Sequence, residues 1–186
     1  MGQYTIISDI SEKIVQCLRA DLVPELLSEE SAVGLCSPEE HGEISLGVFL
    51  YDVQESDEIR RVGMVDRGAD RQQYPPVSLS LYYMLTAYSQ SDRKFRMIQE
   101  QRMLGRVARC FHDNQVLEVE GEQIVLQLQK ISTEDKIKLW NFNGEPFRLS
   151  LFYKAAPVIL ESARFRDVVR VRSVEVGTEV KTGGSR

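Results

Sequence analysis

The fold of this chain is constrained most by residues 75–89, which read PPVSLSLYYMLTAYS. Apolar side chains occupy every second position from Val77 to Leu85, and small or amphipathic side chains fill the positions between them. Because successive side chains of a β-strand point to opposite faces, this alternation gives one aliphatic face and one mixed face. The two prolines precede the alternation, where no ladder N–H is needed. The sequence therefore predicts a central strand of a mixed sheet.

Further strands are predicted on both sides of this segment. Residues 44–53 (ISLGVFLYDV) are apolar on both faces, which favours an interior position in the sheet. The other predicted strands are a short edge strand at 33–36, a hairpin of 116–119 and 124–131, and an alternating strand at 147–155. We expect Pro157 to break the last of these, with an extended apolar run resuming at 158–160.

Three helices are predicted. Residues 6–27 carry one apolar stripe at three- and four-residue spacing, and Pro24 is expected to kink or end that helix. Residues 92–112 form the second helix, with a predicted core stripe of Phe95, Ile98, Met103, Leu104, Val107, Ala108 and Phe111. A short third helix runs from a cap at Ser132, followed three residues later by Asp135, to about Trp140. Together these elements predict an α/β (α+β) fold with a central mixed, largely antiparallel sheet, two long helices and one short helix.

Two segments lie outside this pattern. Residues 54–73 are polar and charge-rich, which predicts a long exposed loop of the kind that is usually functional or disordered. Residues 163–181 alternate valine with arginine and are strand-like, but they lie beyond the apparent end of the domain. We therefore expect one domain at residues 1–162, followed at 163–186 by an extended C-terminal arm and a flexible terminus.

Charge, cysteine content and hydropathy disfavour several classes of protein. A formal net charge of -5 disfavours a nucleic-acid-binding domain, which is usually basic. The three cysteines, Cys17, Cys36 and Cys110, are no disulfide framework and suit a reducing compartment. The N-terminus lacks the basic start and apolar run of a signal peptide, and no apolar run approaches the roughly 18–20 residues of a membrane-spanning helix. We expect cytoplasmic synthesis without a signal peptide or membrane anchor, and later release inside a larger particle stays open.

No motif for catalysis, cofactor binding or metal binding stands out. The two histidines form the pairs Cys36/His41 and Cys110/His112, whereas a structural zinc site needs about four N/S ligands with paired spacing. Glycine-rich phosphate loops, GxSxG and HExxH are absent from the sequence. Acidic pairs such as Asp66/Asp70 and Glu39/Glu40 are typical of solvated surface. We therefore predict no metal, no cofactor and no enzymatic activity.

The second helix has a basic face opposite its predicted core stripe. The basic residues are Arg93, Lys94, Arg96, Arg102, Arg106 and Arg109. Most helical charge faces are simply solvated, but arginine is also enriched at protein interfaces. Solvated surface, a protein interface and a nucleic-acid contact all stay open at this point.

The C-terminal arm has two interpretations. Its candidate contact residues are Arg164, Arg166, Val169, Arg170, Val171, Arg172, Val174 and Val176. A strand with a free edge is an aggregation hazard unless it finds a partner, and strand addition to another protein's sheet is a known recognition mode. The arm therefore either adds to a neighbour's sheet or folds back as the last strand of its own domain.

Four segments together resemble the cap, or tail-terminator, family of contractile injection systems, which are phage-tail-like particles of the anti-feeding-prophage kind. They are VFLYDVQES at 48–56, PPVSLSLYYMLTAYS at 75–89, RMLGRVARCFHDNQVL at 102–117 and LWNFNGEPFRLSLFYKAAPVIL at 139–160. They occur in the family's order, and the resemblance covers about residues 6–162. The chain departs from the family pattern at Asn141-Phe142, at Asn114-Gln115 and in the longer charged loop at 54–73.

The resemblance implies a tail-terminator-like fold and structural work. Such a protein forms a ring, expected to be a homohexamer, on the end of the inner tube and the last sheath layer, where it ends polymerisation and anchors the sheath. The implied partners are further copies of the chain, sheath subunits and the inner tube protein, with no membrane. Residues 164–180 become a candidate arm on a sheath subunit, and Arg102, Arg106 and Arg109 a candidate ring or tube interface. The alternative function is a protein or nucleic-acid adaptor module that uses the basic helix face.

Overall fold

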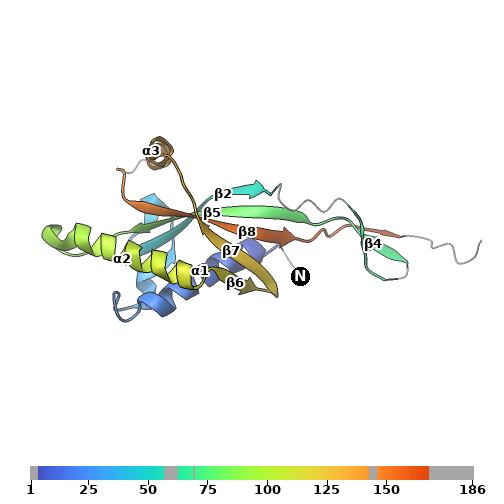
Figure 1. Cartoon of the computed structure of the whole chain (residues 1–186), viewed down its shortest axis with the longest axis horizontal. Helices are drawn as coiled ribbons and strands as arrows, with labels where there is room; N and C mark the ends of the chain where they lie inside the picture. Colours follow the sequence, from blue (N-terminus) through green and yellow to red (C-terminus); the bar gives the residue numbers. More distant parts are fainter. Residues whose placement is uncertain (1–3, 57–62, 69, 143–145, 168–186) are drawn as a thin grey trace, which may run out of the picture. The chain divides into compact units, whose positions relative to one another are not determined.

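Strand β5 (Val77–Ala87) lies inside a six-stranded sheet in a computed structural model of the chain, which describes residues 4–56, 63–68, 70–142 and 146–167 (Figure 1). The order of strands is β1-β2-β5-β8-β7-β6. β1 (Val33–Leu35) pairs with β2 (Leu46–Glu55) in parallel, and every other neighbouring pair is antiparallel. The remaining strands are β6 (Val116–Val119), β7 (Glu122–Leu128) and β8 (Ser150–Leu160). The predicted mixed, largely antiparallel sheet is confirmed.

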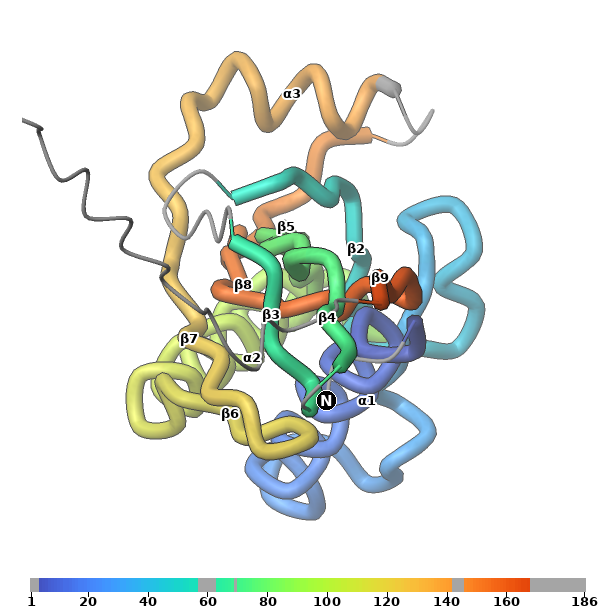
Figure 2. The backbone as a smooth tube through the Cα atoms, turned by 90° about the vertical axis from the view of Figure 1, so that its right-hand side faces the viewer, coloured from blue at the N-terminus to red at the C-terminus, as the bar shows by residue number. Residues whose placement is uncertain are grey.

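Helices cover both faces of this sheet. Figure 2 shows α3 (Thr133–Phe142) on the opposite side of the strands from α1 (Ile6–Leu22) and α2 (Arg93–Asp113). Two single-turn 3-10 helices, η1 (Glu30–Ala32) and η2 (Pro38–Glu40), flank β1 along the chain. None of the helices in these described ranges is long and apolar enough to cross a bilayer.

Side chains on the two faces of β5 pack into two different hydrophobic cores. Leu81, Tyr83 and Leu85 belong to the large core beneath α1 and α2, whereas Met84 packs with Trp140 and Phe152 beneath α3. The phenol of Tyr83 is fully buried and lies 2.8 Å from the Ser11 hydroxyl. Burial raises the pKa of Tyr83 to about 12, and the contact with Ser11 opposes that shift. Both faces of the central strand are therefore committed to packing.

The helix boundaries follow the capping signals in part. Pro24 ends α1 at Leu22, earlier than the predicted residue 27, because the residue before a proline favours an extended backbone and Val23 has φ -101 and ψ 135. At α3 the predicted cap is confirmed, since the Asp135 N–H donates to the Ser132 hydroxyl at 3.1 Å.

Two predictions about the core and the strands are wrong. Phe95 and Ile98 are 58% and 49% exposed, since they lie on the first turns of α2, which project beyond the sheet (Figure 1). β8 also continues through Pro157. Two residues of β8, Ala156 and Pro157, stand against Ser80 of β5 at a register shift, and a bulge is a position where proline's missing N–H is tolerated.

A second compact unit forms from segments far apart in the sequence. The chain divides into one unit of Met1–Arg61 and Pro76–Glu161 and another of Val62–Pro75 and Ser162–Arg186. In the second unit, β4 (Arg71–Gln73) pairs antiparallel with both β3 (Val65–Asp66) and β9 (Phe165–Asp167). Part of the segment predicted as a loop at 54–73 is therefore strand, because residues far away in the sequence supply its partner.

Candidate functional site

The first turns of α2 expose apolar side chains beside basic ones. Phe95, Met97 and Ile98 are 58%, 68% and 49% exposed. The basic side chains on the same turns are also exposed, namely Arg93, Lys94 and Arg96. Aromatic residues, methionine and arginine are enriched at protein interfaces relative to the rest of the surface. We call these six residues the α2 tip.

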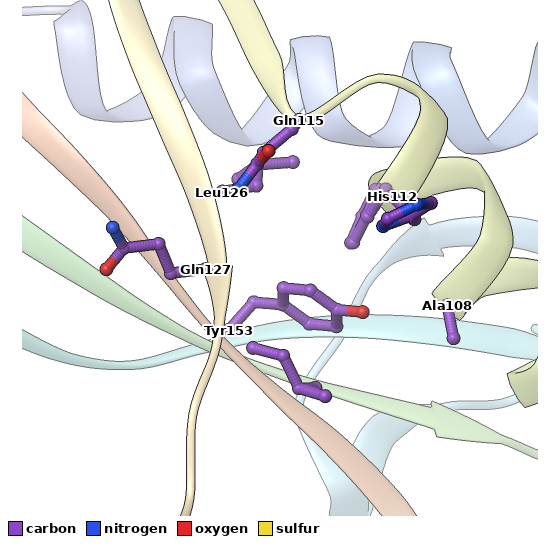
Figure 3. Close-up of a pocket in the computed structure, with 8 residues that line it drawn as sticks. Ala108, His112, Gln115, Leu126, Gln127 and Tyr153 are labelled. Atoms are coloured by element: carbon purple, nitrogen blue, oxygen red, sulfur yellow. The ribbon is translucent and has the colours of Figure 1, made fainter.

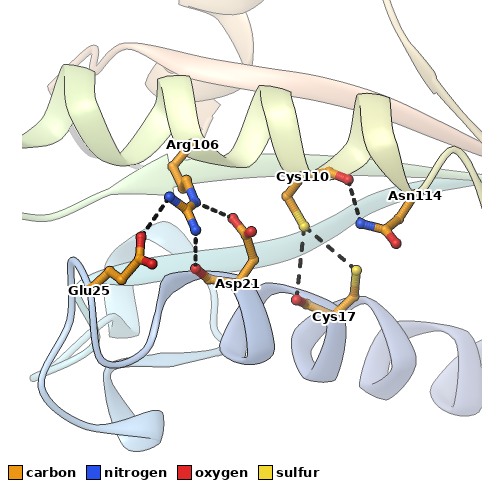
Figure 4. Close-up of polar contacts among 6 residues, drawn as sticks. All are labelled: Cys17, Asp21, Glu25, Arg106, Cys110 and Asn114. Carbon is orange, nitrogen blue, oxygen red and sulfur yellow. Dashed lines mark hydrogen bonds and ion pairs between the residues drawn. The ribbon is translucent and has the colours of Figure 1, made fainter.

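Further along α2, Arg106 forms its ion pairs within the chain. Its Nε lies 2.6 Å from Oδ2 of Asp21, and its Nη1 lies 2.8 Å from Oε2 of Glu25 (Figure 4). A third bond runs from Nη2 to the Asp21 carbonyl oxygen at 3.0 Å. The guanidinium therefore ties α2 to the end of α1 and the turn that follows it.

The other two predicted interface residues differ from Arg106 in exposure. Arg102 and Arg109 are exposed on α2 one turn to either side of it. Together with Arg106, Gly105, Glu25 and Leu26 they line a groove of about 310 Å³. The structure thus places all three predicted arginines on one face of α2, and it leaves Arg102 and Arg109 facing solvent.

A groove beneath α3 was not found by the sequence reasoning. It has a volume of about 610 Å³ and an apolar floor with a charged rim. Its floor includes Tyr51, Tyr82, Ile131 and Leu139, and its rim Asp52, Asp135 and Lys138. Burial, with smaller contributions from Asp52 and Tyr82, raises the pKa of Tyr51 to about 12. The groove arises where α3 packs against the sheet, and no local sequence pattern predicts that contact.

The start of the predicted C-terminal arm pairs within the chain. Arg166 lies in β9 opposite Gln72 of β4, and the Tyr74 N–H donates to the Arg164 carbonyl oxygen at 3.0 Å. The Arg164 guanidinium lies 4.4 Å from the centre of the Tyr74 ring. The other candidate arm residues, Val169, Arg170, Val171, Arg172, Val174 and Val176, lie outside the described residues.

The outer edge of β2 offers a second place for a partner strand. β1 pairs only with Leu46, Gly47 and Val48, the first three residues of this ten-residue strand. From Phe49 onward, no other strand of the described ranges pairs with that edge. An open edge presents backbone donors and acceptors that a neighbouring chain can use.

The histidines and cysteines are not gathered into a metal site in the described part of the chain. His41 stacks on Tyr88, with ring centres 4.0 Å apart, and burial raises the pKa of Cys36. His112 is exposed and lines a pocket of about 280 Å³ with Tyr153 and Phe111 (Figure 3). No three His, Cys, Asp or Glu side chains of the described ranges are placed to hold a metal ion. The features that stand out are exposed surfaces, namely the α2 tip, the grooves along α2 and beneath α3, and the open edge of β2.

Comparison with known proteins gives one family match and similar solved structures. Residues 9–173 match the family model described as the Pvc16 N-terminal domain. The fold is similar to the sheath/tube terminator of an extracellular contractile injection system, PVC, in its extended state (TM-score 0.70, 21% identity). It is equally similar to the anti-feeding prophage cap, a tube-terminating cap (TM-score 0.70, 21% identity). A comparison with curated protein sequences finds no significant match.

These matches cover nearly all of this chain but not all of the similar chains. The alignments cover 100% and 92% of this chain, and 67% and 61% of the PVC terminator and the anti-feeding prophage cap respectively. The chain thus spans about two thirds of the length of these solved structures. At this level of identity the likeness shows a shared fold, the tail-terminator fold expected from the four sequence segments.

Proposed function

Because the chain belongs to the Pvc16 N-terminal domain family, we propose that it is a terminator, or cap, of a contractile injection system. In this role it forms a ring, a homohexamer, on the end of the inner tube and the last sheath layer. The ring ends polymerisation and anchors the sheath, so that contraction drives the tube. The proposed partners are further copies of the chain, the sheath subunits and the tube protein.

The single observation that carries this proposal is the family match over residues 9–173, which spans every helix and strand of the described chain except the first three residues of α1. The two solved structures of the same fold are named as a sheath/tube terminator and a tube-terminating cap. Those proteins are structural, and the same is proposed here, without an enzymatic activity. The chain would be made in the cytoplasm and then be carried in a released particle.

Contact surfaces suited to a ring support the proposal. A ring needs a heterologous interface, in which one patch of a subunit meets a different patch of the next. At 3.6 residues per turn, the exposed Phe95 and Ile98 of the α2 tip share the side of the helix that carries Arg102 and Arg109, so apolar and basic side chains lie along one face. Each exposed ion pair contributes only about 0–1 kcal/mol, but repetition around a closed ring multiplies such contacts.

The arm is proposed to link the ring to the sheath. Its first residues pair with β4 in the same chain, so β9 would act as the base of the arm and residues 168–180 as its free part. Valines at alternate positions suit strand addition to a sheath subunit, and the arginines between them discourage unspecific pairing. Folding back onto the chain's own domain is the alternative for these residues.

Electron cryo-microscopy of assembled particles tests the ring and the arm separately. Particles lacking this chain would be complemented with the full chain or with a chain truncated after Asp167, which keeps β9. We expect the full chain to give a six-fold ring at one end of the tube. The truncated chain should still form the ring but leave the last sheath layer unanchored. Absence of density at both ends with the full chain would contradict the terminator role.

A nucleic-acid-binding measurement on the purified chain at several salt concentrations tests the alternative interpretation, an adaptor module that uses the basic face of α2. Arg106 already pairs with Asp21 and Glu25, which leaves less positive charge for an anionic partner. An adaptor for nucleic acid would bind it with an affinity that falls steeply as salt rises, and this binding would not depend on residues 168–180.

A further inference from the structure

Two cysteines from distant parts of the sequence face each other across α1 and α2. The sulfur atoms of Cys17 and Cys110 lie 3.6 Å apart, although the residues are 93 positions apart in the chain (Figure 4). Cys110 is 1% exposed and Cys17 is half-buried. A disulfide needs a sulfur–sulfur distance of about 2.05 Å, so the two atoms must approach by only about 1.5 Å.

The neighbouring contacts hold the two helices at this spacing. Arg106 and Asp21, one helical turn from Cys110 and Cys17 respectively, are joined at 2.6 Å. The Cys110 thiol also lies 3.8 Å from the Cys17 carbonyl oxygen, so it points at the backbone of α1. The third cysteine, Cys36, follows β1, and its sulfur lies against Gly47 of β2. The pair is therefore specific to Cys17 and Cys110 among the three thiols.

The electrostatics of the pair make one sulfur the nucleophile. The pKa of Cys17 is lowered to about 7, because its thiolate accepts a hydrogen bond from Cys110 and Lys13 lies nearby, while burial and Asp21 act in the opposite direction. The pKa of Cys110 is raised by the same contact with Cys17 and by burial. At neutral pH Cys17 is thus partly a thiolate, and a thiolate is the form that attacks disulfides.

We propose that Cys17 and Cys110 form a disulfide-forming site that is reduced where the chain is made and closes when the chain meets an oxidising medium. The oxidant is a low-molecular-weight disulfide such as glutathione disulfide. The Cys17 thiolate attacks one glutathione sulfur, the glutathione S–S bond breaks, and one glutathione thiolate leaves. Cys110 then gives up its proton and attacks the Cys17 sulfur, which releases the second glutathione thiolate. Two protein thiols are oxidised and one glutathione disulfide is reduced to two thiols.

The consequence is a covalent cross-link between the two long helices. It would lock α1 to α2 at the position already held by Arg106 and Asp21. The timing of closure, after a particle leaves the cell, rests on the proposed function, because an oxidising exterior is met only by a released particle. Formation of the bond in the purified chain does not depend on that function.

Peptide mapping of the purified full chain tests the proposal. The chain is incubated with glutathione disulfide or with dithiothreitol, its remaining thiols are alkylated, and it is digested without reduction. We expect the oxidised sample to contain the peptide of Cys17 linked to that of Cys110, with a mass two hydrogen atoms below the sum of the two free-thiol peptides. Cys36 should be alkylated in both samples. A pair of alkylated thiols at Cys17 and Cys110 after prolonged oxidation, or a cross-link through Cys36, would overturn the inference.

Thermal unfolding gives an independent readout. The oxidised chain should unfold at a temperature roughly 5–10 °C higher than the reduced chain, since a long loop is closed in the unfolded state. Cys36→Ser should keep this difference, whereas Cys17→Ser and Cys110→Ser should each remove it. An equal shift in Cys110→Ser would show that the oxidant acts elsewhere. Particle assembly is measured separately, so failure of the cross-link and failure of the terminator role remain distinguishable.

Discussion

Arg106 of α2 donates from Nε to the carboxylate of Asp21 on α1 at 2.6 Å, and it also reaches the backbone carbonyl of the same residue. The side chains of Arg106 and Asp21 are 20% and 27% exposed, so solvent screens this pair less than a surface ion pair. The contact joins two helices through residues that are 85 positions apart in sequence. Arg106, which the sequence reasoning assigned to a ring or tube interface, thus stabilises the contact between α1 and α2 within the chain.

We expect Arg106→Ala to lower the midpoint of thermal unfolding by a few degrees, because Asp21 loses its charged partner and its carbonyl a donor. Arg106→Lys should recover part of this loss, since lysine keeps the charge but lacks the planar fork. Arg102→Ala, an exposed site on the same helix, is the matched control and should leave the midpoint nearly unchanged. Equal effects of Arg106→Ala and Arg102→Ala would contradict a structural role for Arg106.

The α2 tip predicts a variant that folds but does not assemble. Phe95→Glu combined with Ile98→Glu should change the free energy of unfolding by no more than about 0.5 kcal/mol, because both side chains are exposed. The same variant should no longer assemble into the particle, so less of it should be recovered with purified tubes and sheaths. Gln101→Glu, also exposed on α2, adds charge without touching the tip and should be recovered normally. Normal recovery of the double variant would exclude the tip from the interface.

Trp140 anchors the smaller core beneath α3. Its side chain is fully buried against Met84 and Phe152, and its indole N–H has no hydrogen-bond partner within the described residues. Trp140→Ala should cost about 3–5 kcal/mol of stability, through lost burial and a cavity. Trp140→Phe should cost clearly less, because it keeps an aromatic ring and removes the unpaired N–H. Urea unfolding followed by circular dichroism measures both, and equal costs of the two variants would contradict the packing role of the aromatic ring.

The thiol pair predicts a pH profile for alkylation. Because the pKa of Cys17 is lowered from 9.0 to about 7, its alkylation by iodoacetamide under reducing conditions should reach half its maximal rate near pH 7. The groups that face it are Cys110, which lowers the value, Lys13, which also lowers it, and Asp21, which raises it. Reactivity is therefore present above about pH 7 and is lost as the pH falls through that value.

Two variants separate the cause of this profile. Cys110→Ala removes the hydrogen-bond donor, so the midpoint should move upward toward 9.0, whereas Cys110→Ser retains a donor and should keep part of the shift. A midpoint that stays near pH 7 in Cys110→Ala would assign the shift to Lys13 instead.

Much of the fold can be predicted from the sequence because its strongest signals are local. The alternation from Val77 to Ala87 specifies a strand, since the period of two is a property of neighbouring residues. The cap at Ser132 and the stop before Pro24 likewise act within one helical turn. The residues and order of the four family-like segments also indicated the tail-terminator fold, which the comparisons confirm.

The exposed surfaces could not be predicted from the sequence, because they depend on which distant elements pack together. Phe95 fits a core stripe by its spacing, yet it is exposed because the sheet ends before the first turns of α2. Pro157 remains inside β8 because it lies in a bulge of that strand opposite Ser80 of β5, and β4 becomes a strand because β9 supplies its partner. None of these outcomes is encoded within one element.

What the sequence by itself determined is therefore the family, the three helices and the strands of the six-stranded sheet, through periodicity, capping and the order of its segments. The tertiary structure alone decided that Cys17 meets Cys110 and that Arg106 meets Asp21. It also decided which apolar side chains stay uncovered. The physical reason is that spacing reports the face on which a side chain lies, whereas the partner of that face is set by packing between elements far apart in the chain.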